Sequence, residues 1–388
     1  MEIINAVLAA IGKVVGLIVL LGAFFTGTIS VTAPPPAQQV ATDSTSSPQA
    51  TTAASPQATT SVAKPEEKNG LASPARPLRD VLDEEIRGPF SPPVSSSPVS
   101  TTPTKSQEQI NEETRDALVN ILCLPQTGLS TGISGSGVIV DGRGVILTNA
   151  HIAQYFLLRD YLQPGNVTCT VRTGSPAQAM YTATLLYLPP AWVAANAAQL
   201  KSAQAVGTGE QDFAFLLITG RTDPAAALPP SFPHLAMDRA YADIGDPMLL
   251  AAYPAGFLGA ETVQKSLYAS SAIAYVTQLF SFSASKNIGL FSVGGTVVSQ
   301  GGSSGGAAVR LRDGTLAGII VTETTAATTG ERDLRALALS HIDDALTASG
   351  NGGIVGLLMG DLSAKAAVFN TTIAPSETAL LEAVLKGN

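Results

Sequence analysis

The sequence is poor in charge, cysteine and histidine. Asp, Glu, Lys and Arg make up only 13% of the 388 residues, and 30 acidic against 22 basic residues give a net charge of −8. Binding of nucleic acid needs clustered basic charge, so we expect no such partner. Two cysteines and three scattered histidines do not suggest a metal site, and we expect neither a metal nor a cofactor. Hydrophobic residues, at 45%, still suffice for a sizeable core.

Charge is absent altogether from the stretch 14–31. About 18 to 20 such residues cross a bilayer, so we predict a single-pass signal anchor over 1–31 that contacts the membrane through residues 3–31. Lys13 precedes the stretch, which places the N-terminus in the cytoplasm and the remaining chain in a periplasmic or extracellular location. A cleaved signal peptide is the alternative, because 31–33 (Val-Thr-Ala) resembles a cleavage site, although Pro34 should hinder cleavage.

Aromatic residues are almost missing from 32–105, which is rich in Pro, Ser, Thr, Ala and Gln. Such a segment cannot bury enough apolar surface to offset its chain entropy, so we predict a disordered linker. Within it, 78–86 is either a short helix or docking motif, or a charged patch of linker. We expect the folded domain at 106–346 and a C-terminal extension at 347–388.

Two short motifs carry the chemistry. In the segment 135–151, an apolar run leads to His151 at its end. The glycine-rich turn 301–306 contains Ser304. Between them, Asp212 opens a further apolar run, 61 positions after His151. A serine hydroxyl becomes a nucleophile when an imidazole takes its proton and a carboxylate holds that imidazole in the right tautomer. The chain order His, Asp, Ser is one of the known arrangements of such a triad.

We therefore predict a catalytic base, an orienting carboxylate and a nucleophile, which are His151, Asp212 and Ser304. The backbone N–H groups of Gly302 and Ser304 are the expected donors to an oxyanion. Other readings stay open: His151 as a core residue, Ser303 as the nucleophile, or another carboxylate in place of Asp212, namely Asp223, Asp238 or Asp243. The turn is not a P-loop, because no Gly-Lys-Ser/Thr follows it.

The motifs resemble those of trypsin-like serine proteases. Residues 148–151 (Thr-Asn-Ala-His) are similar to the Thr-Ala-Ala-His or Thr-Asn-Ala-His of that family, and 302–306 (Gly-Ser-Ser-Gly-Gly) to its Gly-Asn-Ser-Gly-Gly or Gly-Asp-Ser-Gly-Gly. Residues 212–214 (Asp-Phe-Ala) and 253–256 (Tyr-Pro-Ala-Gly) resemble the Asp-Leu-Ala and Gly-Asn-Pro-x-Gly of the bacterial HtrA (DegP-like) branch. Ser303 departs from the family, which has Asn or Asp there.

The resemblance, which covers roughly 115–346, implies an all-β chymotrypsin-like fold. Two six-stranded antiparallel barrels are expected, with His151 and Asp212 on the first and Ser304 on the second. The extension 347–388 is too short for the PDZ domain that usually follows in the HtrA branch. Sequence patterns predict short strands beside Asp-Gly turns and peripheral helices: strands at 138–140, 307–311 and 316–322, and helices at 191–200, after His341 and at 377–386.

The resemblance also implies a serine endopeptidase that cleaves unfolded or exposed polypeptides through an acyl-enzyme. By family position, four residues line the substrate cleft: Val298, Thr322, Glu323 and Thr324. A preference for Lys or Arg before the cleaved bond needs Asp at the position that Val298 occupies. We therefore expect a small or medium apolar substrate residue before that bond. The main alternative is a catalytically silent adaptor with a protease fold that binds peptides. An esterase is a further one, although the absence of Gly-x-Ser-x-Gly argues against an α/β-hydrolase.

The two cysteines, Cys123 and Cys169, lie on predicted strands on either side of His151. Outside the cytoplasm such a pair usually forms a disulfide. We predict this bond, with the strands as neighbours and the two Cα atoms about 4.4 to 6.8 Å apart.

Overall fold

The computed structural model describes residues 105–129, 132–202, 209–282, 287–323 and 328–387. The predicted signal anchor lies outside these ranges, as does the predicted linker except for Lys105. No helix within the described ranges is both long and apolar enough to cross a membrane.

The described chain opens with the helix α3 (Gln107–Ala117), which begins at a capping box. The Ser106 hydroxyl accepts a hydrogen bond from the Gln109 N–H, and the Gln109 side chain accepts one from the Ser106 N–H. Two otherwise unpaired backbone donors are thereby satisfied. The helix buries Ile110 and Ala117 and passes directly into the first strand.

The first sheet is a closed barrel in the order β1-β2-β3-β6-β5-β4, which confirms the first of the two expected barrels. Its strands are rich in aliphatic and β-branched residues, which pack well on a pleated surface. Their bounds are β1 (Leu118–Pro125), β2 (Ile133–Asp141), β3 (Val145–Thr148), β4 (Val167–Thr173), β5 (Gln178–Tyr187) and β6 (Ala214–Arg221). Buried side chains such as Ile146, Val171 and Phe215 form the core.

The expectation of a second closed barrel is wrong. The second sheet is an open, half-barrel sheet of seven strands in the order β8-β7-β11-β12-β13-β10-β9. Its members are β7 (Pro247–Ala252), β8 (Ser270–Tyr275), β9 (Gln278–Phe280), β10 (Leu290–Gly294), β11 (Ala307–Arg310), β12 (Leu316–Glu323) and β13 (Leu334–Ala338). The predicted strands 138–140, 307–311 and 316–322 correspond to parts of β2, β11 and β12.

The sheet stays open because its two edge strands, β8 and β9, follow each other in the chain but are separated by a break. Val276 and Thr277 separate β8, which pairs with β7, from β9, which pairs with β10. Val276 exchanges hydrogen bonds with the chain just before β7, accepting from Gly245 N–H at 2.8 Å and donating to Asp246 O at 3.0 Å. The Thr277 N–H instead donates to Ser292 O in β10 at 2.8 Å. One regular strand is thus replaced by two short ones.

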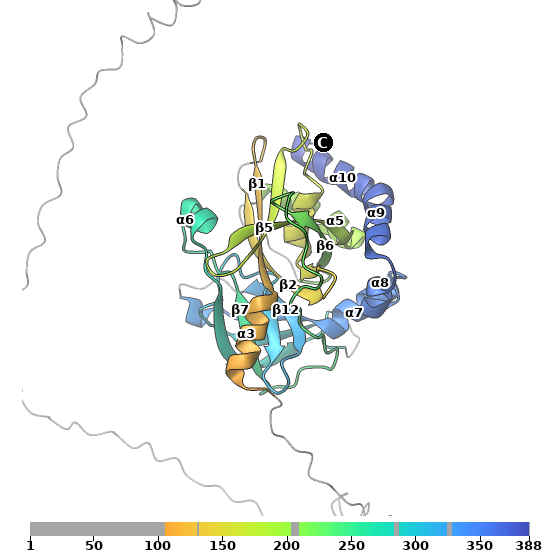
Figure 1. The fold of residues 1–388 in the computed structure, drawn as a ribbon. Coiled ribbons are helices and arrows are strands. Elements are labelled where there is room, and N and C mark those ends of the chain that lie inside the picture. Colours follow the sequence, from red (N-terminus) through yellow and green to blue (C-terminus); the bar gives the residue numbers. More distant parts are fainter. Residues whose placement is uncertain (1–104, 130–131, 203–208, 283–286, 324–327, 388) are drawn as a thin grey trace, which may run out of the picture. The chain divides into compact units, whose positions relative to one another are not determined.

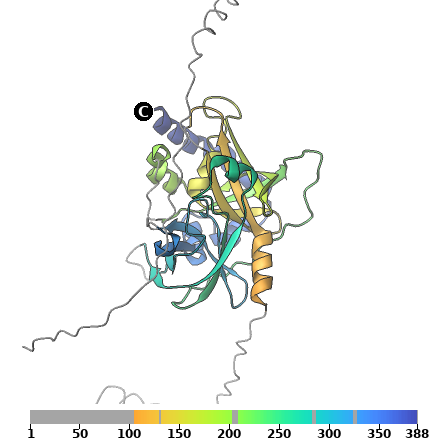
Figure 2. The same ribbon diagram turned by 90° about the vertical axis from the view of Figure 1, so that its left-hand side faces the viewer.

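Helices surround the sheets, and the last four follow one another along one side of the molecule (Figure 1). The view at right angles shows α3 on a different side from the C-terminal end (Figure 2). The remaining helical elements are α4 (Ala150–Ala153), η1 (Gln154–Phe156), α5 (Pro190–Asn196), η2 (Ala197–Lys201), α6 (Ala260–Lys265), η3 (Thr329–Glu331), α7 (Leu339–Ala348), α8 (Gly353–Leu358), α9 (Leu362–Thr372) and α10 (Ala374–Lys386). The three predicted helices fall on α5 with η2, on α7 and on α10.

The C-terminal helices pack on the first barrel and the segments beside it. Asn370 of α9 donates to Leu185 O in β5 at 2.7 Å, and the Thr378 hydroxyl of α10 donates to Leu157 O at 3.1 Å. Arg143, in the β2–β3 turn, donates to Leu358 O at 2.6 Å. The segment 347–387 is therefore bound to the β-structure through side-chain to backbone contacts.

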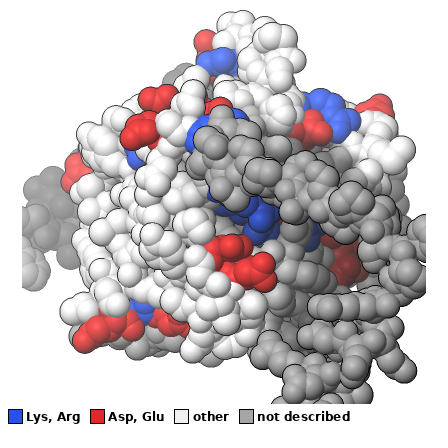
Figure 3. Space-filling model, turned by 90° about the horizontal axis from the view of Figure 1, so that it is seen from below, with Lys and Arg blue, Asp and Glu red and all other residues white. Residues whose placement is uncertain are grey.

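Charged side chains are sparse on the face seen in Figure 3, in agreement with the low charged fraction of the sequence. Small groups of acidic and basic residues lie near one another there, with no broad field of one sign. The described chain contains ion pairs such as Arg239–Asp343 at 2.8 Å.

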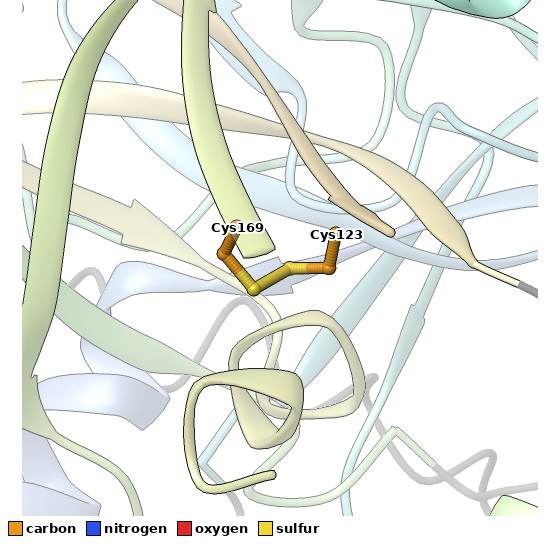
Figure 4. Close-up of a disulfide and its surroundings, with 2 residues drawn as sticks. All are labelled: Cys123 and Cys169. Carbon is orange, nitrogen blue, oxygen red and sulfur yellow. A yellow bond between two sulfur atoms is a disulfide. The ribbon is translucent and has the colours of Figure 1, made fainter. Parts of the chain in front are cut away.

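The predicted disulfide is confirmed. Cys123 on β1 and Cys169 on β4 lie directly opposite each other in an antiparallel pair and are covalently joined (Figure 4). Their Cα atoms are 4.0 Å apart, slightly less than expected. The bond closes a loop with a sequence separation of 46 that contains His151.

Reduction of this disulfide, or the double substitution Cys123→Ala and Cys169→Ala, should lower the free energy of unfolding by about 4 kcal/mol at most, because closing a loop of this length restricts the unfolded chain. We expect a lower midpoint of thermal unfolding and an unchanged circular dichroism spectrum at room temperature. Reductant should not change the midpoint of the double variant. Equal midpoints for the oxidised and reduced wild-type protein would contradict the prediction.

Candidate active site

The pairing of β3 with β6 brings His151 and Asp212 together. Thr148, the last residue of β3, is paired with Ala214, the first residue of β6. His151 follows Thr148 by three residues, on the short helix α4, and Asp212 precedes Ala214 by two. The chain reaches Asp212 through Gln211, which has a left-handed φ of 57°, a conformation uncommon for residues other than glycine.

Both oxygens of the Asp212 carboxylate bind His151. Oδ2 lies 2.7 Å from Nδ1 of the imidazole, and Oδ1 accepts the backbone N–H of His151 at 3.0 Å. Asn149 adds a hydrogen bond from its side-chain amide to the Asp212 carbonyl at 2.7 Å. The side chains of His151 and Asp212 are only 22% and 10% exposed. The carboxylate is therefore held in place and in turn fixes the ring, with the proton on Nδ1.

The Asp212 carboxylate raises the pKa of His151. Burial acts first and lowers the pKa, but the negative charge of Asp212 and its hydrogen bond outweigh burial, so that the pKa lies above its usual 6.5. Nε2 makes no hydrogen bond among the described residues. The pair therefore combines an oriented, more basic imidazole with a nitrogen that is available to accept a proton.

The glycine-rich turn 301–306 lies between β10 and β11 and requires glycine at two points. Gly302 has a φ of +90°, and a Cβ atom there would lie 2.8 Å from Tyr253 O. Gly305 has a φ of +83°, and its Cβ would lie 2.1 Å from Ser136 O in β2. Only glycine combines this backbone conformation with so close an approach.

The two predicted oxyanion donors are free of internal partners. Neither the N–H of Gly302 nor that of Ser304 donates a hydrogen bond within the described ranges. The two donors are alternate residues of one tight turn, whose intervening Ser303 N–H is bound to Gln300 O at 3.2 Å. N–H donors without internal partners are one requirement of an oxyanion site.

Ser304 lies where the two sheets meet, on the side of the barrel that carries His151. Its carbonyl accepts the Ser136 N–H at 2.7 Å, and the Ser136 carbonyl accepts the Thr148 hydroxyl at 2.7 Å. Ser304 is half-buried. Its hydroxyl makes no hydrogen bond to His151 or to any other described residue, and in proteins without bound substrate such catalytic hydrogen bonds are often long.

The alternative site residues have other surroundings. Ser303 is 1% exposed and its hydroxyl is buried without a partner. Asp238 forms ion pairs with Arg310 and Arg312. His341 is not one of these alternatives; it packs against Phe282, and burial lowers its pKa.

The predicted substrate-binding residues are described only in part. Val298 is completely buried in the core of the second sheet. Thr322 and Glu323 lie at the end of β12, opposite Arg335 and Leu334, and Thr324 lies outside the described residues. Their contact with substrate stays a prediction.

Sequence reasoning missed three residues that support the site. Asn149 binds the backbone of Asp212, and the buried Ser136 and Tyr253 contact each other beside the turn 301–306. Asn149 lies within the histidine motif. The contact between Ser136 and Tyr253 joins residues 117 positions apart in the sequence, and no local pattern indicates that they meet.

Residues 135–319 match the family model of the trypsin-like peptidase domain. This part of the chain is a trypsin-like peptidase domain. The match lies inside the predicted domain at 106–346 and includes His151, Asp212 and Ser304.

Two solved structures are similar to this chain. The active form of the Rv3671c protease from M. tuberculosis is 18% identical, with 68% of this chain and 93% of that chain covered and a TM-score of 0.39. An inactive form of Rv3671c from M. tuberculosis H37Rv, with a serine replaced by alanine, is 16% identical, with 64% and 95% covered and a TM-score of 0.40. No curated protein sequence matches the chain, and its placement in the HtrA branch stays a prediction.

Replacing Asp212 with Asn should lower the pKa of His151, because the charge that raises it is lost while burial remains. Histidine NMR titrations should show a midpoint above 6.5 in the wild-type protein and a lower one in Asp212→Asn. His341 serves as the internal control, with an unchanged midpoint below its usual value. A His151 midpoint that stays in place or rises in the variant would contradict the assignment.

The raised pKa of His151 also makes the stability of the folded protein depend on pH. A folded-state pKa above the unfolded value means that the protonated His151–Asp212 pair stabilises the folded protein fully below the unfolded pKa of about 6.5. That contribution is lost as the pH rises through the folded-state pKa, and it should be absent at any pH from Asp212→Asn.

Proposed function

We propose that this protein is a serine endopeptidase with His151, Asp212 and Ser304 as its triad. The Ser304 oxygen attacks the carbonyl carbon of a peptide bond while its proton passes to Nε2 of His151. Breakage of the C–N bond then releases the amine, which takes that proton and leaves an acyl-enzyme ester on Ser304. Water, deprotonated by His151, then attacks the ester carbon. The bond to the Ser304 oxygen breaks, His151 returns the proton to that oxygen, and the carboxylic acid product leaves. The negative oxygen formed in each step binds the N–H groups of Gly302 and Ser304.

The observation that carries the proposal is the doubly bound Asp212 carboxylate. With 2.7 Å from Oδ2 to Nδ1 and 3.0 Å from Oδ1 to the backbone nitrogen, it holds one tautomer and stabilises the imidazolium formed during the reaction. The unpaired donors of the turn beside it and the match to a peptidase domain support the same chemistry.

Polypeptides are the substrate class that follows from a peptidase domain. We propose that unfolded or exposed segments are cleaved, and that the residue before the scissile bond is small or medium-sized and apolar. Val298, which is apolar and buried, supports this preference over one for Lys or Arg, since no carboxylate stands at that position.

Replacing Ser304 or His151 with Ala should each abolish nearly all hydrolysis of a denatured protein substrate by the full-length protein. The double variant should be little worse than either single one, because triad members act as a unit. Labelling of the wild-type protein by a fluorophosphonate probe, followed by mass spectrometry, should modify Ser304.

The adjacent serine provides the matched control, since Ser303→Ala should retain both hydrolysis and labelling. Additive losses in the double variant, or full activity of Ser304→Ala, would contradict the triad. Peptide binding without hydrolysis or labelling of the wild-type protein would instead support the silent adaptor.

We also propose that the protein is anchored in the cell membrane through 14–31, with the peptidase on the outer side. The support is the absence of charge over this stretch and the position of Lys13 before it. The full-length protein should remain in the membrane fraction after a carbonate wash, and added protease should reach the peptidase domain from the outer side. A soluble form that begins near Pro34 would contradict the anchor.

A further inference from the structure

Ser136 is a buried residue of the first barrel that binds the turn carrying Ser304. It lies in the middle of β2, and its side chain is completely inaccessible to solvent. Its hydroxyl donates to Gly302 O at 2.8 Å and accepts the Tyr253 N–H at 2.9 Å, and its own N–H donates to Ser304 O at 2.7 Å. One residue of the first sheet is thus bound to the turn of the second sheet at two points.

Each carbonyl of the turn from Gly301 to Ser304 accepts a hydrogen bond. The donors, in order along the turn, are Ala255 N–H at 2.7 Å, the Ser136 hydroxyl at 2.8 Å, Gly306 N–H at 2.9 Å and Ser136 N–H at 2.7 Å. Of these donors, Gly306 is the last residue of the turn itself and Ala255 lies in the segment after β7. The other two come from Ser136.

These anchors determine where the free N–H groups point. In a trans peptide the C=O and the N–H point in opposite directions. The bond to Gly301 O therefore directs the N–H of Gly302, and the bond to Ser303 O directs the N–H of Ser304. The Ser136 hydroxyl holds the peptide between these two, so the angle between the two donors depends on it.

The hydroxyl suits this position because it donates and accepts at once. An apolar side chain there leaves both the Gly302 carbonyl and the Tyr253 N–H buried without these partners, a costly arrangement that the turn can relieve by rotating the Gly302–Ser303 peptide.

We propose that Ser136 is a positioning residue for the oxyanion site. Its hydroxyl fixes the Gly302–Ser303 peptide so that the N–H groups of Gly302 and Ser304 point at the same oxygen. The inference rests on the proposed function. It assigns to the first barrel a part in transition-state stabilisation besides the presentation of the base.

The test compares two isosteric substitutions in the full-length protein, Ser136→Thr, which keeps the hydroxyl, and Ser136→Val, which lacks it. Threonine and valine have the same shape and differ only in that a methyl group of valine replaces the threonine hydroxyl. The difference in activity between the two variants therefore reports the hydroxyl. For Ser136→Val we expect kcat/KM for a peptide substrate to be lower than for Ser136→Thr by about 10- to 100-fold, mainly through kcat, because misplaced donors cost factors of this order. The inhibition constant of a peptide boronate, whose tetrahedral adduct places an oxygen in the oxyanion site, should rise by a similar factor.

Three controls separate this role from a general loss of structure. The fraction of protein titrated by a fluorophosphonate at saturation should be equal in the two variants, and the pH midpoint of kcat/KM, set by His151, should not move. Ser134→Ala removes a hydroxyl on the same strand whose one partner among the described residues is Asn120, at 3.0 Å. It should leave kcat/KM within about twofold of wild type, as expected for a group that does not contact the turn.

Equal kcat/KM and equal boronate inhibition for the Thr and Val variants would overturn the proposal. A loss confined to KM, or one explained by a smaller titrated fraction, would also overturn it. A wild-type protein that neither hydrolyses peptides nor reacts with the fluorophosphonate would instead overturn the proposed function and, with it, this role.

Discussion

The close approach of the glycine-rich turn to strand β2 is the constraint on which the site depends. The first sheet carries the base and the carboxylate, and the second carries the candidate nucleophile with its N–H donors. These halves meet where Gly305 lies so near the Ser136 carbonyl that a Cβ atom would be 2.1 Å from it. Hydrogen bonds across the contact fix its geometry. A side chain at Gly305 would separate the two halves of the proposed chemistry.

Local patterns in the sequence predicted the parts of the site that short segments determine. His151 and Asp212 each adjoin an apolar strand, and the pairing of Thr148 with Ala214 brings them together. The open second sheet was not predictable in this way, because the break at Val276 and Thr277 contains neither glycine nor proline and arises from partners in β10 and before β7. Helix α9 was missed because its apolar residues do not gather on one face. The role of Ser136 depends on partners 117 and 166 positions away.

The disulfide and helix α10 stabilise the barrel that carries the base. The disulfide joins β1 to β4, and α10 binds the carbonyl of Leu157, six residues after His151. Neither contact involves the carboxylate or the imidazole. These elements therefore contribute stability to the barrel that presents His151, whereas the pKa of His151 is set by burial and by Asp212 alone.

The central claim is that one oxygen nucleophile, one base and two backbone donors converge on a single reacting centre. A crystal structure of the protein after reaction with a peptide phosphonate tests it most directly. The account predicts a bond from phosphorus to the Ser304 oxygen, and a phosphonyl oxygen about 2.7 to 3.1 Å from the nitrogens of both Gly302 and Ser304. It also predicts that His151 remains bound to Asp212. Phosphorus attached to Ser303 or another residue, or a phosphonyl oxygen directed away from both nitrogens, would contradict the account.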